Sequence, residues 1–248
     1  MLEHSRLEKD SPIPLYYQLK ELIRNAIREK GLVPGDPIPS ERELVEQYQI
    51  SRPTVRQAIN ELVNEGLLVR EKGRGTFVAK PKLDQWFLTN MLSFTKEMSL
   101  KGLSHSTRVL DLRVVPIEPR LSEIFGEACR EVVRLERLRF VEGTPAVVVT
   151  TYIPRDIAPD IERENLEQRS LYELIETKYG HEISYGRRVV EAVNASGEDA
   201  ALLQVEKGAA IQLIKTTGYL SDNRPFEYSI ARYRGDFNSF TVTLRYQR

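Results

Sequence analysis

The sequence predicts an α+β fold in two parts: a helical N-terminal third that ends in a β-hairpin, and a mainly antiparallel sheet with a few helices in the remainder. Two observations predict this class. Apolar residues recur at helical spacing in three segments before residue 66. From residue 107 onward β-prone runs outnumber helical ones, and hairpin turns join them. Because a hairpin reverses the chain, the strands that it joins are antiparallel.

Length and composition limit the class of protein. A chain of 248 residues suits one large or two ordinary domains, and 41% hydrophobic with 29% charged residues is typical of a globular protein with a core. No apolar run is long enough to cross a membrane, and the N-terminus lacks a secretory signal. One cysteine and three scattered histidines offer no disulfide framework and no zinc pattern. We therefore expect a cytoplasmic protein without a membrane segment, metal or cofactor.

Three helices are predicted in the N-terminal part. Residues 14–30 carry apolar side chains at helical spacing, with a proline in the first turn. After a loop at 31–40, Ser40 and Glu43 form a capping box that begins a second helix, which ends near Gln49. Ser51 caps a third helix almost at once. The second and third helices are therefore joined by a very tight turn.

A basic hairpin follows the third helix. Residues 67–80, "LLVREKGRGTFVAK", contain β-prone residues around a glycine-rich tip. Three helices and a hairpin predict a winged helix-turn-helix domain at 1–79, followed by a linker at 80–94 and a second domain at 95–248. In that domain the strand candidates are 107–115, 132–143, 144–154, 184–195, 210–235 and 239–246, and the helix candidates are 120–126, 165–180 and 197–205.

The start of the third helix, "SRPTVRQAI", suits a polyanion. Arg52 and Arg56 are four residues apart, so they share one face, roughly opposite the apolar stripe. A recognition helix enters the major groove by its first turns, where arginines reach guanine or phosphates. Ser51 and Thr54 suit phosphate oxygens, and Arg74 at the wing tip suits the minor groove. An ordinary solvated arginine face is the alternative. The tight turn, the two caps and the basic wing together favour DNA, although the formal net charge is zero.

The segments "PSERELVEQY", "SRPTVRQAI" and "GRGTFV" closely resemble the DNA-binding domain of GntR-type bacterial transcription regulators. The second half resembles the effector-binding UTRA domain of the HutC subfamily, in "SFTKEMSLKG", "RLRFVEGTPAVVVTTYIP", "SLYELIETKYG" and "YRGDFNSF". The resemblance implies a homodimeric repressor on an operator of inverted-repeat symmetry, controlled by a small metabolite. It also implies the DNA contacts Arg42, Ser51, Arg52, Thr54, Arg56, Arg74 and Gly75.

The resemblance to phosphosugar-responsive members of this subfamily implies an effector site. The implied residues are Ser93, Phe94, Thr95, Arg137, Arg139, Ser170 and Tyr172 around a phosphate, with Glu227 and Tyr233 at the sugar end. The residue types suit the chemistry, because alternate residues of a strand point the same way and guanidinium groups bind oxyanions. Val149 departs from the pattern, since those relatives have a glutamate there. An amino sugar phosphate is thus in doubt, and another anionic metabolite remains open.

Other interpretations compete with this one. Arg137 and Arg139 could form a structural ion pair with Glu136 or Glu227. The second domain could serve only for dimerisation. The UTRA fold resembles that of chorismate lyase, so an enzyme acting on a small anion is a further alternative. A similar fold alone does not imply a similar catalytic activity. The sequence also contains no evident acid–base pair or activated nucleophile. We therefore expect a regulator with no catalytic residues.

Overall fold

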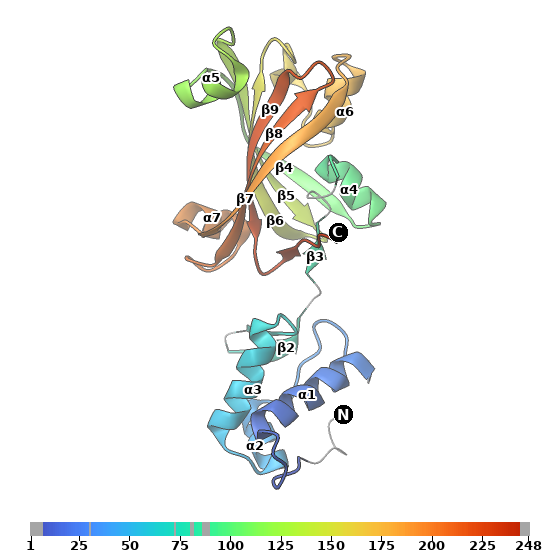
Figure 1. Ribbon diagram of the computed structural model, residues 1–248, viewed down its shortest axis with the longest axis vertical. Helices are drawn as coiled ribbons and strands as arrows, with labels where there is room; N and C mark the ends of the chain where they lie inside the picture. Colours follow the sequence, from blue (N-terminus) through green and yellow to red (C-terminus); the bar gives the residue numbers. More distant parts are fainter. Residues whose placement is uncertain (1–6, 30, 72, 80–81, 86–89, 244–248) are drawn as a thin grey trace, which may run out of the picture. The chain divides into compact units, whose positions relative to one another are not determined.

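The computed structural model describes residues 7–29, 31–71, 73–79, 82–85 and 90–243. The chain divides into two compact units, Met1–Lys82 and Leu83–Arg248 (Figure 1). Each has its own hydrophobic core. The units are described separately below.

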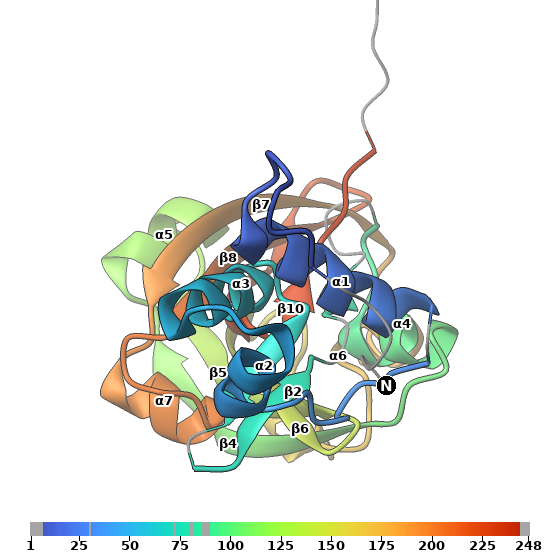
Figure 2. The same ribbon diagram turned by 90° about the horizontal axis from the view of Figure 1, so that it is seen from below.

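The N-terminal unit consists of three helices and a hairpin, as predicted. The elements are α1 (Leu15–Glu29), α2 (Glu41–Tyr48), α3 (Arg52–Asn64), β1 (Leu68–Glu71) and β2 (Gly75–Val78). Figure 2 shows α2 and α3 beside α1. Apolar side chains of all three helices form one core, which includes Leu19, Leu44 and Ile59. Lys20 of α1 and Glu61 of α3 add an ion pair at 2.7 Å.

The turn between α2 and α3 is as tight as the sequence predicts. Ser40 and Glu43 form the expected capping box at the start of α2. Gln49 ends α2 in the left-handed conformation at φ 50°. Ile50 is buried and Ser51 already caps α3, accepting a hydrogen bond from the backbone N–H of Thr54. This short connection fixes the first turn of α3 relative to α2.

The C-terminal unit is built on one antiparallel sheet, in agreement with the prediction. Its strands lie in the order β4-β5-β6-β9-β8-β7, and every neighbouring pair is antiparallel. Their bounds are β4 His105–Pro116, β5 Glu131–Val141, β6 Thr144–Pro154, β7 Ile183–Asn194, β8 Ala210–Leu220 and β9 Pro225–Arg234.

Short helices cover both faces of this sheet. Helices α4 (Phe94–Leu100) and α6 (Leu171–Thr177) lie on one side, and α5 (Pro119–Phe125) and α7 (Gly197–Leu203) on the other (Figure 1). A 3₁₀ turn, Ile161–Arg163, precedes α6. Leu174 and Ile175 of α6 pack on Leu135 of β5. The functional pocket lies on this same face.

Two predicted elements need correction, and one helix was missed. The helix expected at 165–180 begins only at Leu171, because the Asn165 side chain accepts from the N–H groups of Glu167 and Gln168 and holds them in a turn. The strand expected at 239–246 is only Asn238–Ser239 (β10); Phe240–Thr243 have no regular structure, and 244–246 lie outside the described residues. Helix α4 was not predicted, although Ser93 caps it.

Part of the segment expected as a linker, 80–94, packs on the C-terminal unit. Strand β3 (Leu83–Asp84) pairs in parallel with β10. The buried Gln85 side chain donates to Asn238 Oδ1 at 2.7 Å. The end of this segment, Ser93 and Phe94, begins α4 at the rim of the pocket.

Candidate functional sites: a basic face and an anion pocket

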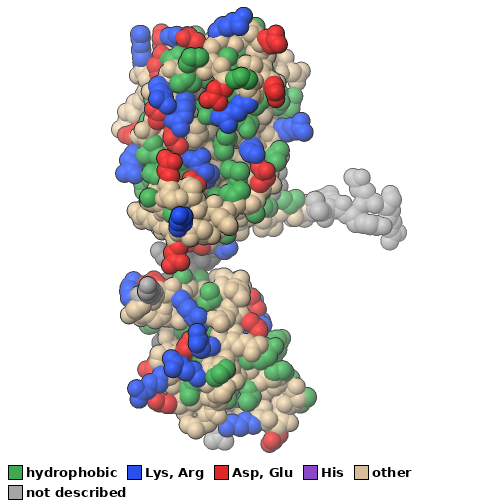
Figure 3. Space-filling view, turned by 90° about the vertical axis from the view of Figure 1, so that its left-hand side faces the viewer, with side chains coloured by type: hydrophobic (Ala, Val, Ile, Leu, Met, Phe, Trp, Pro, Cys, Tyr) green, Lys and Arg blue, Asp and Glu red, His purple; other side chains and the backbone are tan. Residues whose placement is uncertain are grey.

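The first turns of α3 carry the exposed arginines of the N-terminal unit. The side chains of Arg52 and Arg56 are 75% and 59% exposed, whereas Val55, Ile59 and Leu62 of the same helix are buried. Pro53 in the first turn costs no intrahelical hydrogen bond. Several Lys and Arg side chains lie close together on this unit in Figure 3. The helix therefore presents a cationic face opposite its buried stripe.

One carboxylate lies close to three arginines of this face. Glu41, the first residue of α2, lies 3.6 Å from Arg52, 3.8 Å from Arg56 and 3.1 Å from Arg70 of β1. Three guanidinium groups thus share a single counter-charge and keep a net positive potential. Sequence reasoning did not identify Glu41 as the shared partner of these arginines or Arg70 as the third member of the cluster. Their approach depends on how α2 and the hairpin pack beside α3.

The other predicted DNA-contact residues lie around the same helix start and wing. The hydroxyls of Ser51 and Thr54 bond each other at 2.7 Å. Arg42 is fully solvated apart from an ion pair with Glu46. At the wing, Arg74 pairs with Glu71 and lies over the Phe77 ring. Gly75 has φ +126°, a conformation that favours glycine. Lys72 and Lys80, the two lysines of the predicted hairpin segment 67–80, lie outside the described residues.

The second site is a pocket on the sheet face that α4 and α6 flank. Arg137 and Arg139 of β5 both point into it and are only 3% and 9% exposed. In the described part of the chain, no carboxylate forms an ion pair with either guanidinium, and Arg137 Nε has no hydrogen-bond partner. Arg139 lies against the Phe94 ring, 4.8 Å from its centroid. Buried charges are normally paired, so this arrangement fits an anionic ligand.

The structural ion-pair alternative for these arginines is wrong. Glu136 faces the opposite side of the sheet, where it pairs with Arg134 at 2.8 Å and Arg232 at 3.1 Å. Glu227 accepts a hydrogen bond from the Tyr172 hydroxyl instead. Neither carboxylate serves as the partner of Arg137 or Arg139.

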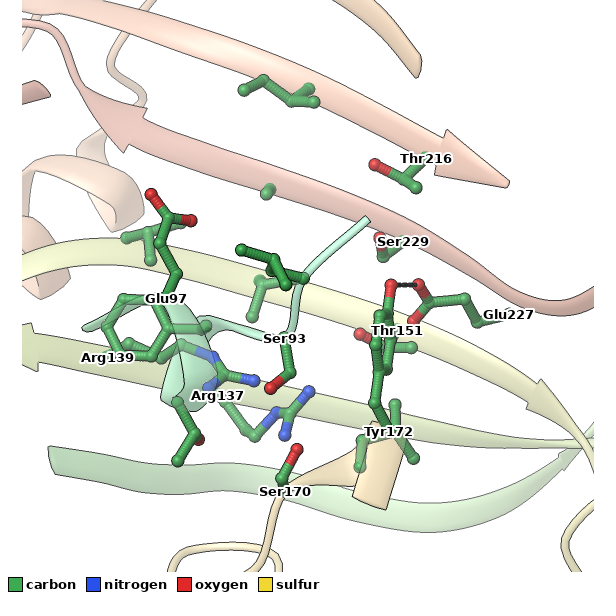
Figure 4. Close-up of a pocket in the computed structure, with 18 of the residues that line it drawn as sticks. Ser93, Glu97, Arg137, Arg139, Thr151, Ser170, Tyr172, Thr216, Glu227 and Ser229 are labelled. Carbon is green, nitrogen blue, oxygen red and sulfur yellow. Dashed lines mark hydrogen bonds between the residues drawn. The ribbon is translucent and has the colours of Figure 1, made fainter. Parts of the chain in front are cut away.

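Hydroxyl groups surround the arginines. Ser93 and Thr95 come from the start of α4, and Ser170 precedes α6. Figure 4 shows Ser93 and Ser170 at the end of the pocket that holds the guanidinium groups. Ser170 makes no side-chain capping bond, which leaves its hydroxyl available to a ligand. The structure thus brings together the predicted effector-site residues, Ser93, Phe94, Thr95, Arg137, Arg139, Ser170, Tyr172, Glu227 and Tyr233.

Burial shifts the protonation equilibria in the pocket. Loss of solvent lowers the pKa of Arg137 well below its ordinary value, and the neighbouring Arg139 adds to this. Burial also lowers the pKa of Arg139 to about 10. The pKa of the Glu227 carboxyl is raised by burial, and burial raises the pKa of Tyr233 to about 12. Each shift disfavours the charged form, and a bound anion would reverse the effect on the arginines.

Sequence reasoning missed four polar residues on the strands that form the pocket floor. They are Thr151 of β6, Arg188 of β7, Thr216 of β8 and Ser229 of β9. Arg188 donates from Nε to Thr216 Oγ1 at 3.2 Å and from Nη1 to the Asn90 carbonyl at 3.2 Å. Val149, the position that departs from the phosphosugar pattern, also lines the pocket. No motif marks these residues, because only the strand pairing brings them together.

A winged helix-turn-helix unit joined to a separate small-molecule pocket is the organisation of a DNA-binding transcription regulator. Comparison with known proteins agrees. Residues 15–78 match the bacterial regulatory proteins of the gntR family, and residues 100–238 match the UTRA domain. The chain belongs to the gntR family and carries a UTRA domain.

Individual relatives support the same classification. The chain is 39% identical over 237 residues to the HTH-type transcriptional repressor NagR of Bacillus subtilis, covering 94% of this chain and 96% of that protein. It is 33% identical to the histidine utilization repressor of Pseudomonas putida, over 83% and 82% of the two chains. The crystal structure of PhnF from Mycobacterium smegmatis superposes with a TM-score of 0.65 at 28% identity, over 94% and 99% of the chains. Both of the sequence relatives are repressors, which argues against the enzyme interpretation.

In the described residues, no helix is both long and apolar enough to cross a membrane. The same residues contain no group of three or more His, Cys, Asp or Glu side chains arranged to hold a metal ion.

Proposed function

We propose that this cytoplasmic protein represses transcription by binding an operator of inverted-repeat symmetry, and that a sugar phosphate in the C-terminal pocket changes its operator affinity. The observation that carries the effector proposal is the pair of buried arginines without a carboxylate partner. Ser93, Thr95 and Ser170 stand beside them with hydroxyl donors. Guanidinium and hydroxyl donors together are the groups that bind phosphate oxygens.

The charge of the pocket supports a dianion. The pocket is lined by three arginines, Arg137, Arg139 and Arg188. Among the described lining residues, Glu227 is a carboxyl that forms no ion pair with a basic side chain; it accepts a hydrogen bond from Tyr172 instead. The other acidic lining residue, Glu97, pairs with Lys101. The lining therefore carries an excess of positive charge. A phosphate monoester with charge about −1.5 to −2 at pH 7 would balance it.

The DNA proposal assigns roles to the basic face. Arg52 and Arg56 would read base edges in the major groove, and Arg42, Ser51 and Thr54 would contact phosphates. Arg74 and Gly75 would approach the minor groove at the wing. The support is the exposure of the arginines on the first turns of α3. In this arrangement Glu41 holds the arginine side chains before DNA arrives.

We also propose that the protein acts as a homodimer, as a symmetric operator requires. Strand β7 is the last strand of the sheet, and its outward side chains Tyr185, Val189 and Val193 are exposed. Arg187 and Glu191 are equally spaced about Val189. Antiparallel pairing of two β7 strands about Val189 would place each arginine opposite the glutamate of the second copy.

The dimer proposal is tested by sedimentation of the full chain. Val189→Asp would place two carboxylates across the symmetry axis and should give a folded monomer at micromolar concentration. Leu100→Asp, at an exposed apolar residue of α4, is the matched control and should stay dimeric. Unchanged association of Val189→Asp would rule out this edge as the interface.

The regulatory function is tested in two linked steps. Selection of bound duplexes from a random pool should return an inverted repeat with half-sites about one helical turn, or a multiple of it, apart. Adding sugar phosphates to that complex should then change operator affinity, and the same compounds should raise the melting temperature by mass action. If carboxylic acids act and every phosphate ester is silent, the effector belongs to another class of anion.

A further inference from the structure

Three missed hydroxyl residues form a continuous row across the pocket floor. Thr151 of β6 lies opposite Ser229 of β9, and Ser229 lies opposite Thr216 of β8. All three are buried, at 1%, 9% and 6% exposure. Figure 4 shows them near Glu227 and Tyr172, away from the end that holds Ser170 and the guanidinium groups.

The hydroxyls in this row have unused hydrogen-bonding capacity. Thr216 Oγ1 accepts from Arg188, so its proton is free to be donated. In the described structure, the hydroxyls of Thr151 and Ser229 make no hydrogen bond. Buried polar groups normally have a partner, which here would be a ligand or water. Hydroxyls both donate and accept, so they suit the hydroxyl groups of a polyol.

An apolar row lies next to the hydroxyl row and ends at Arg137. Val149, Ala231 and Ile214 lie opposite one another on the same three strands, level with Arg137 of β5. Two residues along a strand span about 7 Å, which is comparable to the distance from a terminal phosphate to the hydroxyls of a six-carbon sugar. The floor therefore offers an apolar row that ends at the guanidinium of Arg137 and, two residues along the strands, a hydroxyl row.

The pocket is poorly suited to a cationic substituent on the ligand. The apolar row offers no carboxylate to an amine, because its side chains are Val149, Ala231 and Ile214. Glu227 lies one step beyond the hydroxyl row, is buried, and already accepts from Tyr172. Arg188 lies at the end of the row, opposite Thr216. An ammonium group would meet more positive than negative charge here.

We infer that the effector is a phosphate ester of a neutral polyhydroxylated skeleton, with its hydroxyls bound by Thr151, Ser229 and Thr216. This inference rests on the proposed phosphate site and adds the class of molecule that the phosphate carries. Neutral sugar and sugar-alcohol phosphates belong to this class, and so do N-acylated amino sugars, whose nitrogen carries no charge. Free amino sugar phosphates do not.

The test is calorimetric titration of the full chain with three kinds of probe. Inorganic phosphate reports on the anion end alone. A panel of neutral hexose, N-acetylhexosamine and hexitol 6-phosphates reports on both ends. Glucosamine 6-phosphate carries an ammonium group in addition, so it reports on whether the pocket accepts a cationic substituent. A neutral member of the panel should bind at least tenfold more tightly than inorganic phosphate and than glucosamine 6-phosphate. Tighter binding of glucosamine 6-phosphate than of every neutral ester would overturn the inference.

Variants test the hydroxyl row itself. Thr151→Val, Ser229→Ala and Thr216→Val should each weaken the neutral ester about two- to twelvefold and leave inorganic phosphate unchanged. Thr150→Val is the matched control, because Thr150 is on the same strand but faces Glu136 on the other side of the sheet. Unchanged ester affinity in all three variants would overturn the hydroxyl row but keep the phosphate site. Failure of every phosphate probe to bind the wild type would overturn both.

Discussion

Each of the two units holds a pair of arginines, but the environments of the two pairs are opposite. Arg52 and Arg56, one helical turn apart, are exposed and share the carboxylate of Glu41. Arg137 and Arg139, two residues apart on a strand, are buried without a carboxylate partner among the described residues. The first pair is stable in water and can bind a long polyanion by its surface. The second pair loses its hydration and regains a counter-charge only from a ligand that enters the pocket.

This difference separates the energetics of the two sites. Binding at an exposed arginine face releases counterions, so it weakens steeply with salt. A buried arginine pair is screened much less, and its ligand also stabilises the fold. Operator affinity should therefore depend strongly on salt, while effector affinity should depend on it weakly. Each prediction below changes one charge on one side of this comparison.

The largest effect is expected from Arg137→Met. Truncating one partner of a desolvated charge pair costs about 2–5 kcal/mol, so phosphate-ester affinity should fall by about 30-fold or more. The melting temperature of the ligand-free protein should be unchanged or higher, because an unpaired buried charge is removed. Calorimetry and thermal unfolding of the same preparation measure both quantities.

Arg134→Met is the matched control for this variant. Arg134 is on the same strand but on the other face, where it pairs with Asp111 and Glu136. Its loss should lower the melting temperature and leave phosphate-ester affinity intact. If Arg137→Met instead destabilises the ligand-free protein as Arg134→Met does, then Arg137 is structural.

Arg52→Ala and Arg56→Ala should have the next largest effect, on DNA. Loss of a bidentate base contact costs about 1–3 kcal/mol, or roughly 5- to 150-fold in operator affinity, and it relaxes sequence preference. Arg42→Ala should weaken all duplexes similarly and reduce the salt slope by about 1. Fluorescence anisotropy with selected and scrambled duplexes separates the two behaviours. Equal loss on both duplexes for Arg52→Ala would reassign Arg52 to phosphate contact.

The same contrast explains what could be predicted from the sequence. Arg52, Arg56 and the caps Ser40 and Ser51 lie within one local segment, so helical spacing places them correctly. Arg137 and Arg139 are adjacent positions on one strand face, so their common direction is also a local property. Whether a carboxylate pairs with them is not local. The alternation along β5 already turns Glu136 to the other face, but Glu227 comes from β9, and its contact with Tyr172 depends on the tertiary fold.

The hydroxyl row shows where prediction from one sequence ends. Thr151, Thr216 and Ser229 belong to strands that are neighbours in space in the order β6-β9-β8. Their alignment depends on the register of two pairings that the hydrophobic pattern alone does not fix. Helix α4 was missed for a related reason. It has seven residues, too few for the helical period to stand out.

A smaller effect is expected from Glu41→Gln. Removing the shared carboxylate leaves three arginines without their counter-charge, so affinity for random duplex should rise a few-fold and its salt dependence should steepen, by at most about 0.9 in the slope. The ratio of specific to random affinity should fall, because the side chains are no longer held in place. Anisotropy at several salt concentrations measures this. Glu46→Gln, which frees only Arg42, is the control, and a parallel loss on both duplexes would mean that Glu41 supports the fold instead.

The smallest effect concerns stability against pH and compares a buried with an exposed carboxyl. Burial raises the pKa of Glu227 above its ordinary value of 4.5, so the folded state holds this proton at pH values where the unfolded state has lost it. The contribution of Glu227 to stability is therefore present below pH 4.5 and is lost as the pH rises through the folded-state pKa. Glu227→Gln should remove this loss and make the ligand-free protein more stable at pH 7.

Glu164 supplies the opposite sign. The Lys178 hydrogen bond lowers the pKa of Glu164 below 4.5, so its contribution is present above pH 4.5 and is lost as the pH falls through the folded-state pKa. Glu164→Gln should therefore lower stability at pH 7 and flatten the acid side of the profile. Urea unfolding of both variants between pH 3 and pH 8 measures the two slopes. If Glu227→Gln follows Glu164→Gln, the buried carboxyl is held ionised by the pocket arginines. Glu227 would then balance one of the three lining arginines, and the effector would need to balance only the remaining positive charge.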